Sequence, residues 1–146
     1  MRRESILWVT QGNLAHLERE RYLLLEAVTY LRIILEEIDK TEDLPPDIAS
    51  QVYLVGEFSR RGEDYVRAWL YLAAAAQMDK SIQNPNTRRG LEIGAEDQLN
   101  DLRMYMQAAG IPPPTWGEGS EIPREEIAMV NRLVVRFRQM QAQSRE

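Results

Sequence analysis

Residues 52–75, VYLVGEFSRRGEDYVRAWLYLAAA, predict two helices joined by a tight turn. Apolar or small residues recur three or four positions apart on both sides of the turn, which is the spacing of one helical face. Gly62 suits the end of the first helix, and Asp64 can cap the second. We expect Gly56 and Ala68 to meet where the two helices cross, because small residues let helix backbones approach closely.

Helical spacing continues on both sides of this hairpin. Strand signals are nearly absent, since no β-branched residues alternate with polar ones and no Asn-Gly or Asp-Gly turn occurs. We therefore predict an all-α array of five to six antiparallel helices. In chain order they span residues 4–11, 14–38, 47–61, 65–78, the region from the loop at 84–87 to 109, and 123–146, with Gly12-Asn13 joining the first two.

The helix predicted over 14–38 has one apolar face. This stripe, which we expect to face the core, consists of Leu17, Leu24, Leu31 and Ile38 at every seventh position, with Ala27, Val28, Ile34 and Leu35 between them. Two glycines further along the chain, Gly90 and Gly94, stand four residues apart. We expect them to allow a neighbouring helix to approach closely.

The chain divides into three segments. A helical domain covers residues 1–110, a linker rich in Pro and Gly covers 111–122, and an amphipathic helix covers 123–146. The apolar face of this last helix is wider than solubility requires, with a stripe made of Ile127, Val130, Val134, Phe137 and Gln141. Either the helix caps the array, or it docks onto a second copy or a partner.

The hairpin resembles a tetratricopeptide repeat. The matching positions are Val52, Val55-Gly56, Tyr65, Ala68, Leu72 and Ala75, where large and small residues follow the order of that repeat. Ser59 departs from it, because the repeat has an aromatic residue there, and no proline closes the second helix. The resemblance implies a right-handed α-solenoid of helix pairs that binds other proteins.

A second resemblance starts from residues 53–69, YLVGEFSRRGEDYVRAW, followed by Asn84-Pro85 and an amphipathic helix. This segment is similar to the C-terminal helical half of a bacterial family, domain of unknown function 2225. The resemblance covers about residues 15–108. Members of that family carry a cysteine-rich, zinc-binding segment ahead of the helices. Since this chain has no Cys, no zinc role carries over.

The composition excludes several classes of function. The chain has 146 residues, a formal charge of −5, no Cys and one His, which leaves no disulfide framework, cysteine zinc site or catalytic thiol. Its basic residues form no clustered face of the kind that binds nucleic acid. The N-terminal apolar run is too short for a signal peptide, and the longest apolar stretch, 68–76, is too short to cross a bilayer. We expect a soluble cytoplasmic protein without a cofactor, a nucleic-acid partner or a membrane insertion.

The charged residues suggest no catalytic or metal site. His16 and Glu20 share a helical face but lack the further ligands that a metal needs. The acidic residues between 36 and 47 lack the glycine and glutamate of a calcium loop. No Asp or Glu has an apolar sequence setting that would raise its pKa for acid catalysis. We expect neither a metal site nor an enzyme.

The candidate binding surface lies on the helix over 47–61. The residues expected to point away from its core stripe, toward the concave side of the array, are Ser50, Tyr53, Glu57, Arg60 and Arg61. Tyr and Arg contribute strongly to binding in protein interfaces. The alternative is that Arg60 and Arg61 only solvate the helix end. The set predicts a non-enzymatic interaction module that binds a peptide or helix. The alternative function is a structural subunit that dimerises through its C-terminal helix.

Overall fold

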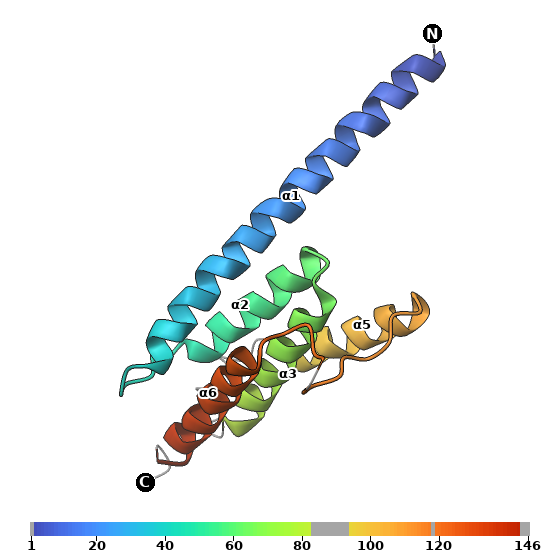
Figure 1. Ribbon diagram of the computed structural model, residues 1–146. Coiled ribbons are helices and arrows are strands. Elements are labelled where there is room, and N and C mark those ends of the chain that lie inside the picture. Colours follow the sequence, from blue (N-terminus) through green and yellow to red (C-terminus); the bar gives the residue numbers. More distant parts are fainter. Residues whose placement is uncertain (1, 83–93, 118, 144–146) are drawn as a thin grey trace.

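The computed structural model describes residues 2–82, 94–117 and 119–143, and of residues 2–12 it describes the helical backbone alone. Over these residues the chain forms five helices and no strand (Figure 1). They are α1 (Arg2–Asp39), α2 (Ile48–Arg61), α3 (Tyr65–Ser81), α5 (Ala95–Ala108) and α6 (Arg124–Gln143). The all-α prediction is confirmed for this part of the chain.

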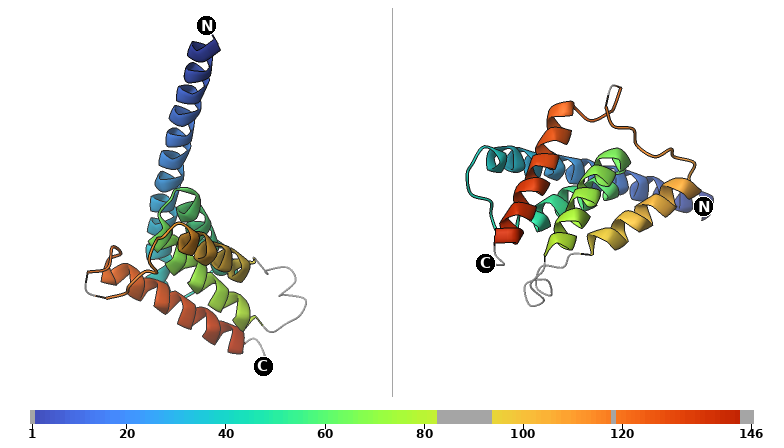
Figure 2. Two further views of the ribbon diagram at one scale, coloured as in Figure 1. Left: turned by 90° about the vertical axis from the view of Figure 1, so that its right-hand side faces the viewer. Right: turned by 90° about the horizontal axis from the view of Figure 1, so that it is seen from below.

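Helices that are neighbours in sequence pack against each other. α1 packs on α2, α2 on α3, and α3 on α5, whereas α6 returns to lie against α3 and the C-terminal end of α1. Figures 1 and 2 show α3 in the middle of this arrangement, with the N-terminal half of α1 projecting away from the other helices. In the described part of the chain, no helix combines the length and hydropathy of a membrane-spanning segment.

The α2–α3 hairpin brings two backbones into close approach. A Cβ atom added to Gly56 would lie 2.9 Å from both the backbone nitrogen and Cγ of Leu72. The predicted partner, Ala68, is fully buried but lies one helical turn earlier on α3. The expected hairpin is therefore present, and the residue of α3 that Gly56 approaches most closely is Leu72 rather than Ala68. Asp64 caps α3 as predicted, since its carboxylate accepts a hydrogen bond from the backbone N–H of Arg67 at 3.2 Å.

Two expectations about glycine were wrong. No joint interrupts the chain at Gly12-Asn13, because α1 is continuous from Arg2 to Asp39. One glycine costs a helix only about 1 kcal/mol, which does not suffice to break it. Gly94 does not admit a neighbouring helix either, because an added Cβ would meet nothing within 4 Å. It instead adopts a φ of +67° immediately before α5, while its expected companion, Gly90, lies outside the described residues.

The core is built from one face of each helix. Its largest fully buried side chains include Leu35 of α1, Ile48 of α2, Tyr71 of α3, Leu102 of α5 and Phe137 of α6. The apolar stripe predicted for α1 is only half covered. Val28 and Leu35 are buried, whereas Leu17 is 58% exposed. We refer to residues 2–23 as the overhang of α1 and to residues 24–39 as its packed half, because every side chain from 13 to 23 is exposed.

The C-terminal helix is integrated into this core. Met129, Val130, Leu133, Val134 and Phe137 are all buried. Arg136 donates hydrogen bonds to the carbonyl oxygens of Thr41 and Glu42, at 2.7 and 3.1 Å, so it also holds the loop that follows α1. The apolar face of α6 is therefore covered within the chain. This packing favours the cap over the alternative in which the helix forms a dimer interface.

Candidate functional site

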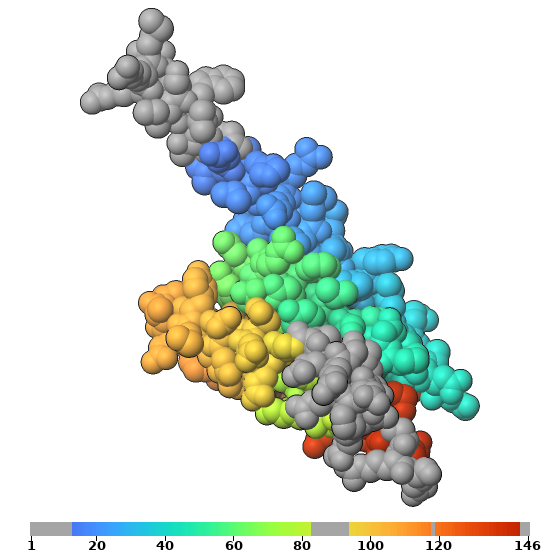
Figure 3. Space-filling model, turned by 180° about the vertical axis from the view of Figure 1, so that it is seen from behind, coloured from blue at the N-terminus to red at the C-terminus, as the bar shows by residue number. Residues whose placement is uncertain are grey.

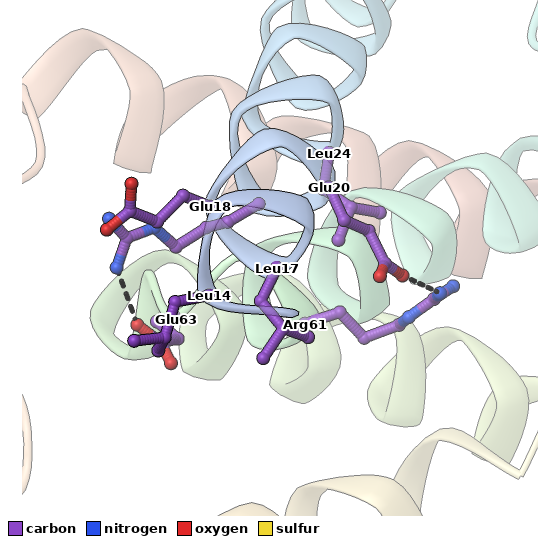
Figure 4. Close-up of a pocket in the computed structure, with 8 residues that line it drawn as sticks. Leu14, Leu17, Glu18, Glu20, Leu24, Arg61 and Glu63 are labelled. Carbon is purple, nitrogen blue, oxygen red and sulfur yellow. Dashed lines mark hydrogen bonds and ion pairs between the residues drawn. The ribbon is translucent and has the colours of Figure 1, made fainter. Parts of the chain in front are cut away.

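A hollow of about 500 Å³ lies between the overhang of α1 and the α2–α3 turn (Figure 4). We call it the overhang hollow. Its lining consists of Leu14, Leu17, Glu18, Glu20, Arg21 and Leu24 from α1, with Arg61 and Glu63 from the turn. Leu14 and Leu17 are more than half exposed, which leaves apolar surface open to solvent in a concave setting.

Two ion pairs connect the overhang to the turn. Arg21 pairs with Glu63 at 2.8 Å, and Arg61 pairs with Glu20 at 3.4 Å. All four side chains are about half exposed, so each pair contributes at most about 1 kcal/mol. The pairs orient charges of both signs on the two sides of the exposed leucines, where a bound segment could contact them.

A second hollow, of about 280 Å³, adjoins the first at Arg61 and Glu63. We call it the α5 hollow. It is lined by Arg60, Arg61, Glu63, Tyr65, Asp101, Leu102 and Tyr105. The Tyr65 hydroxyl donates to that of Tyr105 at 3.3 Å, with the ring centroids 5.3 Å apart. Burial, together with the hydrogen bond to Tyr105, raises the pKa of Tyr65 to about 12.

The structure brings only some of the predicted site residues together. Arg60 and Arg61 line the α5 hollow, and Arg60 makes a two-pronged ion pair with Glu57. Tyr53 is half-buried and packs against the core. Ser50 is partly buried and lines neither hollow. The predicted binding surface did not include Leu17 and Leu24, which line the overhang hollow, because both were assigned to the core stripe of the helix over 14–38.

A buried carboxylate, Glu126, joins three helices. Arg67 of α3 donates to its two carboxylate oxygens at 2.9 and 3.0 Å, and Arg32 of α1 donates at 2.5 Å. The Tyr71 hydroxyl of α3 donates at 2.8 Å. Glu126 is only 7% exposed, so four charge-assisted hydrogen bonds replace its hydration.

This cluster fixes the protonation of its members. Burial alone would raise the pKa of Glu126, but hydrogen bonds and charge from Arg67, with help from Tyr71 and Arg32, hold the pKa below its ordinary value. Burial and the adjacent carboxylate raise the pKa of Tyr71. The carboxylate is thus ionised, and both of its oxygens accept hydrogen bonds within the chain. Glu126 therefore has a structural role and is not an acid that is available to react with a substrate.

The sequence contained a signal for this cluster. Glu126 occupies the first position of the stripe that continues through Val130, Leu133 and Phe137. Arg32 lies on the same side of α1 as the buried residues Val28 and Leu35, four residues after the first and three before the second. A charged residue at a core position indicates a buried partner. A further acid, Asp79, is also buried, but neither it nor Glu126 lines the overhang hollow or the α5 hollow. Across the described residues, no three His, Asp or Glu side chains gather as metal ligands would.

Comparison of the chain with protein-family models, with curated proteins and with solved structures finds no match. The resemblances to tetratricopeptide repeats and to domain of unknown function 2225 therefore remain interpretations of residues 52–75 and their surroundings. The overhang hollow and the α5 hollow are the candidate binding sites of the described residues.

Proposed function

We propose that the chain is a non-enzymatic protein-interaction module whose overhang hollow binds an amphipathic helix of another protein. The observation that carries the proposal is the half-covered stripe of α1. From residue 24 to residue 39 this stripe is packed against the rest of the molecule, whereas N-terminal to residue 24 Leu14 and Leu17 present the same face to solvent. A monomeric soluble protein rarely leaves such a concave apolar surface without a use.

The shape of the site fits a helix. α2 covers the packed half and ends at Arg61, and the added Cβ of Gly62 would lie 2.8 Å from Leu25 of α1. A partner helix that continues in line with α2 would meet Leu24, Leu17 and Leu14 in turn. Their spacing of seven and three residues is the spacing at which one helix packs along another. Figure 3 shows from behind how residues 13–23 of α1 extend past the end of the α2–α3 hairpin.

The charges around the site define the partner further. Glu18, Glu20 and Glu63 are interleaved with Arg21 and Arg61 along the lining. We therefore expect a partner helix with Leu-like residues at positions i, i+3 and i+7 and with charges of both signs beside them. The packed helices hold the lining residues in place before binding, which lowers the entropy cost of forming the complex.

The array that displays this site supports the same function. Sequentially packed helices with a tight hairpin at Gly56 are compatible with the proposed likeness to a tetratricopeptide module. The second candidate, a homodimer through the C-terminal helix, is disfavoured because the apolar face of α6 is buried in the chain.

Selection from a displayed library of amphipathic helical peptides tests the proposal. Bound peptides should share the i, i+3, i+7 apolar pattern and should lose at least about tenfold in affinity for the Leu17→Glu variant, because a charge in an apolar contact is costly. Val135→Glu is the matched control, since Val135 is also about half exposed but lies on α6. Equal binding to both variants would reject the overhang hollow as the site.

A further inference from the structure

The packed half of α1 and the adjoining turn of the overhang carry a second apolar and charged stripe, on the side that faces away from the other helices. Six exposed residues repeat with spacings of four, three, four, three and four, which is the a/d pattern of a coiled coil. We call this the outer seam. It consists of Arg19, Leu23, Glu26, Tyr30, Ile33 and Glu37.

The outer seam exposes large apolar side chains. Leu23 and Ile33 are each 52% exposed and Tyr30 is 66% exposed. The contacts of α1 with the rest of the molecule come from the opposite face, through residues such as Leu35, Arg32 and Leu25. Figure 1 shows the other described helices on one side of α1 only, so a second helix could lie along the outer seam without touching them.

We propose that the outer seam pairs with the outer seam of a second copy of this chain, antiparallel, about a two-fold axis at residue 28. Facing residues then have numbers that sum to 56. Arg19 faces Glu37 of the second copy, Leu23 faces Ile33, and Glu26 faces Tyr30. The first pair joins opposite charges, the second joins apolar residues, and the third joins a carboxylate to a phenol. Each position a faces a position d of the second copy, over about 27 Å of helix.

The charge pattern selects this arrangement over its alternatives. A parallel pairing would place Arg19, Glu26 and Glu37 each against its own copy, which gives like charges at three levels of the seam. Shifting the antiparallel register by one heptad would set Leu23 against Glu26 in one direction and Glu26 against Glu37 in the other. Of these arrangements, only the pairing about residue 28 keeps like charges apart and also sets Leu23 against an apolar residue.

The dimer keeps the overhang hollow accessible. The outer seam and the stripe of Leu14, Leu17 and Leu24 lie on opposite faces of α1. In the dimer, the remaining helices of each copy therefore lie on the outer sides of the two paired α1 helices. The inference therefore does not depend on the proposed function, and either can fail alone.

Sedimentation velocity of the full chain over about a hundredfold range of concentration tests the dimer. Arg19→Glu should raise the dissociation constant about tenfold or more, because two facing pairs become repulsive, and Arg19→Glu with Glu37→Arg should restore it. Arg138→Glu, an equal charge change at an exposed site on α6, should leave it unchanged. A monomer throughout, or a dimer insensitive to these changes, overturns the proposal.

Cysteine cross-linking tests the orientation of the two helices. Because the chain has no Cys of its own, only the introduced thiols can form disulfides. An equimolar mixture of Leu23→Cys and Ile33→Cys chains should form mainly the mixed disulfide, since these positions face each other only in the antiparallel pairing. Both sites are about half exposed, so the variants should fold, and circular dichroism checks that they do. A majority of disulfides between identical variants would indicate a parallel pair and contradict the assignment.

Discussion

The two halves of α1 share one sequence pattern and have different surroundings. Both carry leucines on the same apolar face, yet Leu35 in the packed half is fully buried and Leu17 in the overhang is 58% exposed. The packed half also contributes Arg32 to the buried Glu126 cluster, whereas Arg21 of the overhang makes only a surface ion pair. An apolar stripe thus predicts that a helix face will be covered, and it does not say whether the covering helix belongs to the same chain.

The largest effect on the free energy of unfolding is expected from removing Glu126, which links the packed half of α1 to α6 through Arg32. Glu126→Ala leaves Arg32, Arg67 and Tyr71 without their shared acceptor, so the free energy of unfolding should fall by about 3–5 kcal/mol. Urea unfolding followed by circular dichroism measures this. Glu125→Ala, at the exposed neighbouring position, should change it by less than about 0.5 kcal/mol. Similar losses in both variants would contradict the structural role of Glu126.

A pair of leucine truncations compares the halves directly. Leu35→Ala should lower the free energy of unfolding by about 2–5 kcal/mol, because it opens a cavity in the core. Leu17→Ala should change it by less than about 0.5 kcal/mol, because its side chain already meets solvent. The same urea titration, at a concentration where the chain is monomeric, gives both values. A large loss for Leu17→Ala would mean that the overhang is covered.

The hydrogen-bonded carboxylate of Glu126 should also make the free energy of unfolding depend on pH. The pKa of Glu126 is lower in the folded chain than the ordinary value of 4.5, so its contribution is complete above that value and is lost as the pH falls through the folded pKa. The stability of the native chain should therefore decline more steeply below pH 4.5 than that of Glu126→Gln. Unfolding titrations of both chains across this range make the comparison, and parallel curves would show that the carboxylate is not stabilised by folding.

The smallest effect concerns the overhang. Arg21→Gln removes the ion pair with Glu63, and because both side chains are about half exposed the free energy of unfolding should fall by at most about 1 kcal/mol. Added salt should reduce this difference, since exposed charges are screened. Thermal unfolding at low and high salt measures it. A loss that salt leaves unchanged would indicate that Arg21 acts through packing and not through its charge.

The sequence predicted the hairpin well and the site only in part. Helical spacing, the tight turn at Gly62 and Asp64 as a cap are local features, and local patterns determine them. The continuity of α1 through Gly12 was missed, since propensity for one residue is a weak signal. Of the predicted binding residues, Arg60 and Arg61 line the α5 hollow, whereas Tyr53 is half-buried and packs against the core. Their role in binding a partner stays a prediction.

The remaining failures have a common physical cause. Whether Leu17 is buried, and which acid accepts hydrogen bonds from Arg32 and Arg67, depends on where α2 ends beside α1 and on the return of α6 across α3. These are long-range contacts, separated by up to 94 residues for Arg32 and Glu126. The spacing of residues along one helix indicates which face is apolar, and it does not identify the residues that will cover that face.

Amide hydrogen exchange along α1, measured at a concentration where the chain is monomeric, most directly tests the contrast between the overhang and the packed half. Amides from 28 to 38 should exchange only through global unfolding, whereas those from 13 to 20 should open at much lower free energy, with a step near Leu24. Uniform protection along the whole helix would contradict the division of α1 into an anchored part and a part available for binding.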